Sequence, residues 1–325
     1  MREALFIKQN TERWKKYENR KATSPDELAE SFISITDDLA YAKTFYPKSN
    51  TTRYLNGLAS TFHQSIYKNR KEKSNRFVTF WQKELPMVFY KHRRTLMYSL
   101  LFFVVFFLMG WLSAKYDSTF LRIVLGDDYV NMTDNNIAKG DPLGVYKEMS
   151  PGIMFWEIAK NNVTVMLMCF ALGIIFSVGS IYGLMFNGIM IGSFHYYLFS
   201  KGYGKQVILT TWIHGTLEIS TIILAAGAGM IMGNSFLFPK TYNRWVSLRR
   251  GAKDGLKIAI GIVPIIVTAA VFESFVTRHT EMPLWLNILI IGGSLSFIIW
   301  YVVIYPARLS RTLNPDNIVI DETAF

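Results

Sequence analysis

The chain has 325 residues, half of them hydrophobic, and a formal net charge of +11. That charge alone would suit nucleic-acid binding, but 19 of the Lys and Arg residues lie in residues 1–94, directly before the first long apolar run. Basic residues in that position orient a membrane protein and meet lipid headgroups, so we exclude a nucleic-acid partner. The single cysteine, Cys169, excludes an intrachain disulfide.

Long runs without formal charge define the class of protein. Forty consecutive uncharged residues separate Lys160 from Lys201, and Glu218 is the only charged residue between Lys205 and Lys240. A helix needs about 20 mainly apolar residues to cross a membrane. The sequence therefore predicts an all-α protein, a polytopic transmembrane helical bundle solvated by the lipid bilayer.

Residues 1–94 form the first predicted domain, a basic helical region in the cytoplasm. They carry 19 Lys and Arg against 10 Asp and Glu. Apolar residues recur at helical spacing in 28–39 and again in 55–66. A basic region beside a membrane helix attracts anionic lipid, so we expect anionic headgroups at the inner face.

The second predicted domain, 95–305, holds about six crossings. Their predicted ranges are 95–114, 163–180, 182–199, 206 to about 233, 255–276 and 284–305. The fourth range, with its flanks, is too long for one straight crossing at about 1.5 Å per residue. We therefore expect a short interfacial or re-entrant helix over 207–213, a helix break at Gly215, and a crossing after it. Pro264 predicts a kink in the fifth crossing.

The distribution of charge predicts the orientation of the bundle. The loop 115–160 has 5 basic and 7 acidic residues, whereas the loop 234–254 is basic and the tail 306–325 begins with Arg308 and Arg311. Cytoplasmic loops carry the excess of Lys and Arg. We expect a multi-pass protein of the bacterial cytoplasmic (inner) membrane, with 115–160 as the outer loop and both termini in the cytoplasm.

Small residues recur four positions apart in the predicted crossings. The pairs are Gly179 with Gly183, Gly188 with Gly192, and Gly229 with Gly233. This spacing lets two helix backbones approach closely. It predicts helix packing, and both packing within one chain and packing in a homodimer stay open.

Polar side chains inside the apolar runs are the candidate functional residues. They are Asn161, Asn162, Asn187, His214, Glu218 and Glu273. On the predicted topology all except Asn187 fall in the outer half of the bundle, and His214 and Glu218, four residues apart, share one helix face. Ionisable groups at membrane depth face the bundle interior and have partners.

Three interpretations of this polar cluster stay open. It forms a hydrogen-bonded network that fixes helix packing, it marks a substrate, ion or proton pathway, or it binds a metal. In the third case Glu273 would join His214 and Glu218, since zinc needs three or four ligands. The H-E-x-x-H motif of zinc proteases is absent, so the sequence assigns no metal, no cofactor and no catalytic residue.

Five segments along the chain carry a family resemblance. They are Glu84-Leu85-Pro86 with Lys91–Arg94, Asn161-Asn162, Asn187-Gly188 with Gly192, His214-Gly215-Thr216-Leu217-Glu218, and Ala269-Ala270-Val271-Phe272-Glu273. In their order and spacing the chain resembles the stage II sporulation protein M family of prokaryotic integral membrane proteins. The resemblance implies a cytoplasmic-membrane protein. The family's best-known member belongs to an envelope complex with cell-wall-degrading partners, which it is thought to anchor and organise.

Three hypotheses for the function follow. The first is a non-enzymatic integral membrane subunit that scaffolds or anchors an envelope-associated complex, with other membrane or envelope proteins docked on its N-terminal helices and outer loop. The alternative is a transporter or channel-like component that uses the outer polar cluster. The third is an intramembrane metal-dependent enzyme.

Overall fold

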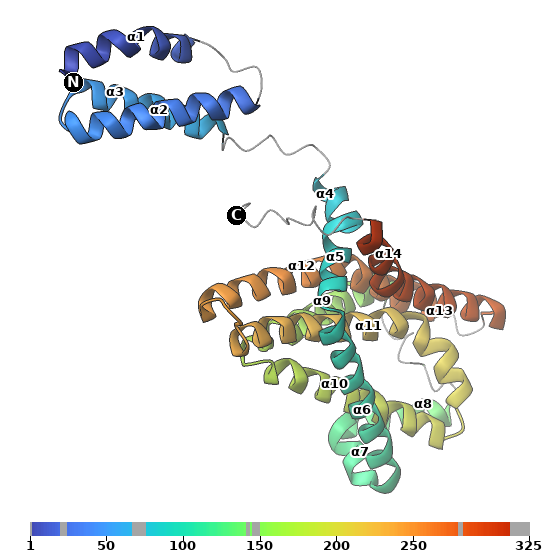
Figure 1. Ribbon diagram of the computed structural model, residues 1–325. Helices are drawn as coiled ribbons and strands as arrows, with labels where there is room; N and C mark the ends of the chain where they lie inside the picture. Colours follow the sequence, from blue (N-terminus) through green and yellow to red (C-terminus); the bar gives the residue numbers. More distant parts are fainter. Residues whose placement is uncertain are drawn as a thin grey trace. The chain divides into compact units, whose positions relative to one another are not determined.

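The computed structural model describes residues 2–19, 25–66, 76–140, 144, 150–278 and 282–312, and every regular element in these ranges is helical (Figure 1). The predicted all-α class is confirmed. The chain forms two compact units, Met1–Arg76 and Phe77–Phe325. Each unit has a hydrophobic core of its own.

Three amphipathic helices form the N-terminal unit. Their bounds are α1 (Glu3–Asn19), α2 (Pro25–Phe45) and α3 (Asn50–Ile66). Ile35 and Leu55 are fully buried between them. The Trp14 indole is buried too, and its Nε1 donates to the Asp38 carboxylate at 2.8 Å. Buried aliphatic and aromatic side chains thus hold these helices together, as the helical spacing of apolar residues predicts.

The segment that leads into the first crossing belongs to the bundle. It comprises α4 (Arg76–Thr79), the π-helix η1 (Phe80–Glu84) and α5 (Leu85–Lys91). Leu85 and Phe89 are fully buried, and Lys257 Nζ donates to Glu84 Oε2 at 2.8 Å. The boundary between the compact units therefore falls at Arg76, earlier than the predicted 94, because the residues after it pack on the later helices.

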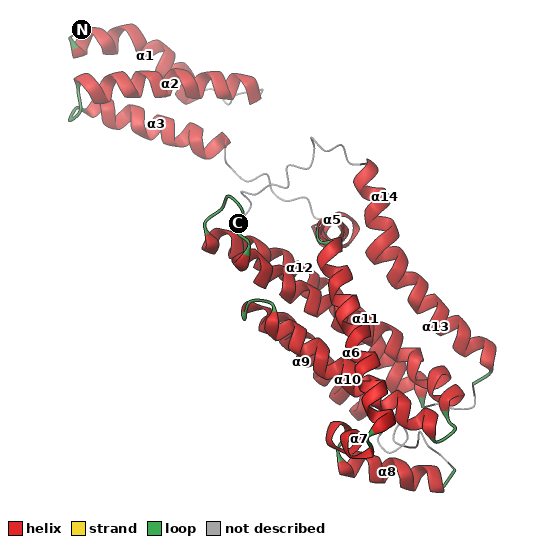
Figure 2. Ribbon diagram, turned by 60° about the horizontal axis from the view of Figure 1, so that its bottom comes forward, coloured by secondary structure: helices red, strands yellow, loops and turns green. Residues whose placement is uncertain are grey.

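The long helices of the bundle run side by side, with α7 and α8 at one end and α5 and α14 at the other (Figure 2). The helices of the bundle that follow α5, long and short, are α6 (Arg93–Tyr116), α7 (Ser118–Leu125), α8 (Asp127–Ala138), α9 (Pro151–Ala171) with η3 (Leu172–Ile174), α10 (Val178–Ser200), α11 (Gly204–Leu237), α12 (Arg244–Val271) with the π-helix η4 (Phe272–Thr277), α13 (Leu284–Ile299) with the π-helix η5 (Trp300–Ile304), and α14 (Tyr305–Thr312).

Five of these helices, with their extensions, are long and apolar enough to cross a membrane. They are Arg93–Tyr116, Pro151–Ile174, Gly204–Leu237, Arg244–Thr277 and Leu284–Thr312. The remaining predicted crossing corresponds to α10, whose 23 residues are about 35 Å long and pack against α6 and α11. Asn187 and His195 lower its hydropathy. The polytopic helical bundle predicted from the sequence is confirmed.

Two crossings begin earlier than the sequence predicts. α9 starts at Pro151 rather than at 163, and α12 starts at Arg244 rather than at 255. Proline suits the first turn of a helix, and Asn243 caps α12 by accepting from the Trp245 N–H at 3.0 Å. Charged residues such as Glu157 lie on exposed turns inside these helices. The start of a helix is therefore better predicted from its capping residues than from the point where charged residues end.

The break predicted at Gly215 is wrong, and so is the short re-entrant helix over 207–213. α11 runs unbroken for 34 residues, about 51 Å. Gly215 is buried inside this helix. One interior glycine costs a helix about 1 kcal/mol, which packing on several neighbouring helices outweighs. Pro264, where a kink is predicted, lies inside α12, which also continues past it.

All six glycines of the predicted packing pairs lie against other segments of the same chain. A Cβ added to Gly192 would collide with the backbone carbonyl of Phe107 on α6, and one added to Gly188 would lie 2.9 Å from the Phe106 Cβ. Gly229 and Gly233 meet the end of α9 and the following turn in the same way. These glycines therefore serve packing within the bundle, and a homodimer would need other residues.

Candidate functional site

α11 and η4 bring together three of the predicted polar residues, namely His214, Glu218 and Glu273. One ligand atom from each side chain lies within 4.8 Å of the others. We call these three residues the His–Glu–Glu cluster. His214 and Glu218 are one turn apart on α11, and Glu273 is the second residue of η4. The predicted meeting of the fourth and fifth crossings at one level is thus visible in the structure.

The histidine of the cluster is oriented by a hydroxyl group. His214 is buried, and its Nδ1 lies 3.0 Å from Thr277 Oγ1. Its other nitrogen, Nε2, lies 3.8 Å from Glu273 Oε1. Both partners come from η4, where the π-helical turn presents residues 273 and 277 to α11. Single π-turns within α-helices occur frequently at functional sites.

The cluster lies in the half of the bundle nearer to α7 and α8. The Tyr197 hydroxyl, near the end of α10, donates to Asp134 of α8 at 2.6 Å, and Lys201 Nζ donates to the same carboxylate oxygen at 2.8 Å. α11 begins at Gly204, directly after this contact, and reaches His214 about 15 Å further along. The cluster therefore sits inside the bundle, some three helical turns from this end.

Three asparagines are also among the predicted polar residues, and the structure shows hydrogen bonds of each within its own helix. Asn161 Nδ2 donates to Asn162 Oδ1 at 3.4 Å on α9. Asn187 Nδ2 donates to the Gly183 carbonyl of its own helix at 2.8 Å. The amide of Asn187, which the topology predicts nearer the inner side, is thus used within α10.

His195, the other buried histidine of the described chain, serves as a contrast to His214. His195 Nδ1 lies 2.8 Å from the Ile191 carbonyl, and Trp212 Nε1 donates to His195 Nε2 at 3.0 Å. The first contact places a proton on Nδ1, and the second requires a lone pair on Nε2. The imidazole ring is therefore neutral, and both of its nitrogens are hydrogen-bonded. His195 is a packing residue that ties α10 to α11.

Sequence reasoning missed the hydroxyl groups around the cluster. Thr277 is four residues after Glu273, and Thr211 is three residues before His214, so helical spacing could have placed both on the cluster face. Among the described residues, the buried hydroxyl oxygens of Thr211 and Ser274 have no hydrogen-bond partner. Buried polar atoms of this kind are rare in folded proteins, and a bound water molecule or ion can satisfy them.

Electrostatics limit what the cluster can do. Two carboxylates that lie close together in a bundle interior repel each other, and the low dielectric constant there strengthens the repulsion. A shared proton, the imidazolium form of His214 or a bound cation would each relieve it. The geometry thus allows a hydrogen-bonded network, a proton or ion relay, and a cation site.

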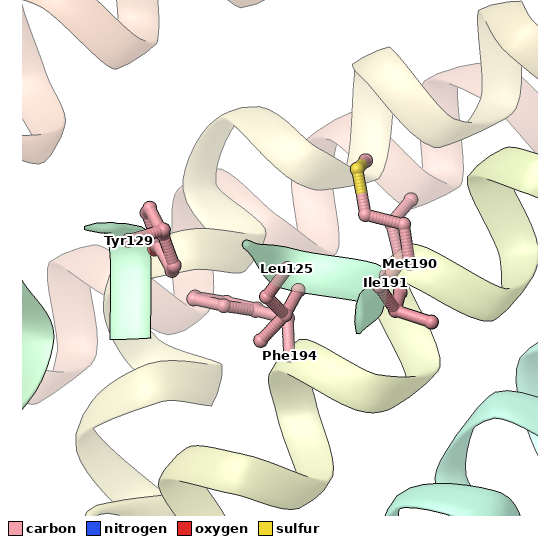
Figure 3. Close-up of a pocket in the computed structure, with 6 residues that line it drawn as sticks. Leu125, Tyr129, Met190, Ile191 and Phe194 are labelled. Carbon is pink, nitrogen blue, oxygen red and sulfur yellow. The ribbon is translucent and has the colours of Figure 1, made fainter. Parts of the chain in front are cut away.

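Lys201, directly after the end of α10, forms an ion pair with Asp134 of α8, outside the predicted crossings. The hydrogen bond from Lys201, and then that from Tyr197, lowers the pKa of Asp134 below its usual value of 3.8. This carboxylate therefore stays charged at neutral pH and anchors α8 to the bundle. An apolar pocket of about 280 Å³ is lined by residues of α7, α8 and α10, namely Val124, Leu125, Tyr129, Met190, Ile191 and Phe194 (Figure 3). The cluster contributes no side chain to this pocket.

The fold and the cluster define the class: a polytopic α-helical membrane protein with ionisable residues inside its bundle. The model of the family described as Stage II sporulation protein M matches residues 99–278, more than half of the chain. The chain belongs to this family. Residues 4–68 match a second model, described as Domain of unknown function (DUF8413). Comparisons with curated proteins and with solved structures gave no match.

Proposed function

We propose that the chain is a non-enzymatic membrane subunit that scaffolds or anchors an envelope-associated complex. The observation that supports this is the modular build of the chain. The N-terminal unit has its own core of Phe6, Trp14, Ile35, Leu55 and neighbouring residues. It also matches its own family model, separate from that of the bundle. A module that folds on its own core beside a membrane anchor suits the docking of a partner protein.

The proposed orientation puts this module in the cytoplasm of a bacterial cell, beneath the inner membrane. The positive-inside rule supports that placement, since 19 Lys and Arg precede the first crossing or begin it. Arg94, exposed at the start of α6, would then contact anionic lipid headgroups. α7 and α8 would offer a second docking surface on the outer face.

Co-purification from native membranes tests the scaffold. The full chain and a variant that lacks residues 1–76 are purified in mild detergent, and the proteins that remain bound are compared by quantitative mass spectrometry. We expect a defined partner that the truncated chain loses while the truncated bundle stays in the membrane. An unchanged set of bound proteins would contradict docking through the N-terminal unit.

A second candidate function is a component of a transporter or channel, and the His–Glu–Glu cluster favours it. Intramembrane ionisable groups often mark substrate or proton pathways. Glu218→Gln and Glu273→Gln keep hydrogen-bonding capacity but remove charge. If the chain carries ions or protons, both variants assemble normally and lose flux in proteoliposomes. A scaffold keeps its partners in both variants.

A further inference from the structure

We propose that His214, Glu218 and Glu273 together bind one divalent transition-metal ion of the zinc type inside the bundle. The inference does not depend on the scaffold function. The ligand chemistry fits, because an imidazole nitrogen and two carboxylate oxygens are the N and O ligands that Zn²⁺ accepts. Three protein ligands with a fourth position left for water is a frequent zinc arrangement.

The distances between the ligand atoms are close to those of a metal site. Bonds of about 2.0–2.2 Å in a tetrahedral site place two ligand atoms about 3.3–3.6 Å apart. His214 Nε2 and Glu273 Oε1 are 3.8 Å apart, and the full set lies within 4.8 Å. The 3.8 Å separation is too long for a hydrogen bond. Small side-chain rotations would bring all three atoms onto one ion.

The surroundings of His214 match those of a metal ligand. A ligating histidine usually donates its second ring N–H to a neighbouring oxygen, which fixes the tautomer and the ring orientation. Thr277 Oγ1 lies 3.0 Å from Nδ1 and supplies that oxygen. This directs Nε2 toward Glu273. His195, by contrast, is held through both nitrogens by packing contacts, so of the two buried histidines in the described part of the chain, His214 is the one arranged like a metal ligand.

Charge and burial supply a second, independent argument. Two carboxylates close together inside a helical bundle repel each other unless a proton or a positive charge relieves the repulsion, and a divalent cation compensates both negative charges in full.

Metal titration tests the site on the full chain. The protein is purified in detergent, its affinity tag is removed, bound metal is stripped with a chelator, and Zn²⁺ is added in competition with a chromophoric chelator. We expect about one Zn²⁺ per chain, a higher unfolding temperature with Zn²⁺, and visible absorption bands of tetrahedral Co²⁺ when Co²⁺ replaces it. The bands report ligand geometry directly.

Matched variants separate the site from adventitious binding. Glu218→Gln and Glu273→Gln should fold, as shown by circular dichroism, and bind Zn²⁺ at least about tenfold more weakly, while Thr277→Val should weaken binding about 10- to 100-fold through loss of ring orientation. Glu157→Gln, at an exposed glutamate of α9, is the control and should bind like the wild type. Zn²⁺ binding that is equal in wild type and cluster variants, or wild-type protein without bound Zn²⁺ and without Co²⁺ bands, would overturn the proposal.

Discussion

Gly192→Ala is the substitution that probes the packing of the bundle most sharply. The added Cβ would collide with the Phe107 carbonyl and lie 3.0 Å from both the Phe107 carbonyl carbon and the Trp111 nitrogen. These are backbone atoms of α6, so relief requires α6 and α10 to move apart as rigid helices. Overpacking of this kind costs about 1–3 kcal/mol. Loss of 1.4 kcal/mol corresponds to a tenfold change in an equilibrium constant.

The assay is equilibrium unfolding in mixed micelles, with loss of helix–helix contacts followed by tryptophan fluorescence. Gly293→Ala is the matched control, because Gly293 is also inside a crossing helix and a Cβ there meets nothing within 4 Å. An interior Gly→Ala change without a clash stabilises a helix by about 0.5–1 kcal/mol. Equal stability of the two variants would refute the close approach of α6 and α10.

Three further predictions address other contacts. Leu55→Ala, at a fully buried position of the N-terminal unit, should destabilise that unit by about 2–5 kcal/mol in denaturant titration and leave the bundle intact. Asp134→Asn removes the contact with Lys201; because the pKa of Asp134 is lowered from 3.8, its stabilisation is present above that pH and is lost at lower pH. Hydrogen exchange of α8 should therefore differ between Asp134→Asn and the wild type at pH 7, and the difference should shrink as the pH falls below 3.8; a difference that does not change with pH would contradict the ion pair. The pair Glu84 and Lys257 is partly exposed, so a double-mutant cycle should give a coupling of about 0.2–1 kcal/mol, and a value of zero would remove its role in holding η1 on α12.

Hydropathy and charge predicted much of the fold because they indicate whether a helix is surrounded by lipid or by water. Long uncharged runs identified the crossings, and their order implied that His214, Glu218 and Glu273 would meet. Each of those inferences uses only the length of a helix and its direction. The class of fold and the core of the candidate site could therefore be read from the sequence.

Features that depend on tertiary contacts could not be predicted in this way. The helix break at Gly215 was inferred from the thickness of a bilayer, yet packing on neighbouring helices keeps α11 continuous through it. Thr277 lies four residues after Glu273, so helical spacing could have placed it on the cluster face. The π-helical turn of η4 that contains both residues could not be predicted, because the sequence has no simple signal for it.

The contacts of residues 77–94 are a further example. Glu84 and Lys257 are 173 positions apart, and their ion pair at 2.8 Å depends on the return of α12 to the start of the bundle. Asp254 likewise accepts from Lys91 and lies 2.8 Å from His92 Nε2. The sequence prediction placed Glu84, Lys91 and His92 in the helical region 1–94, Asp254 in the loop 234–254 and Lys257 in the crossing 255–276, and it did not pair them, whereas the structure pairs them across helices.

Cysteine labelling tests the placement of the bundle in the membrane most directly. In a Cys169→Ala background, Asp128→Cys places an exposed thiol in α8, and Thr241→Cys places one in the turn before α12. A membrane-impermeant maleimide added to intact spheroplasts should label Asp128→Cys at once and Thr241→Cys only after permeabilisation. The reverse pattern, or labelling of both without permeabilisation, would contradict a bundle that carries its His–Glu–Glu cluster in the outer half.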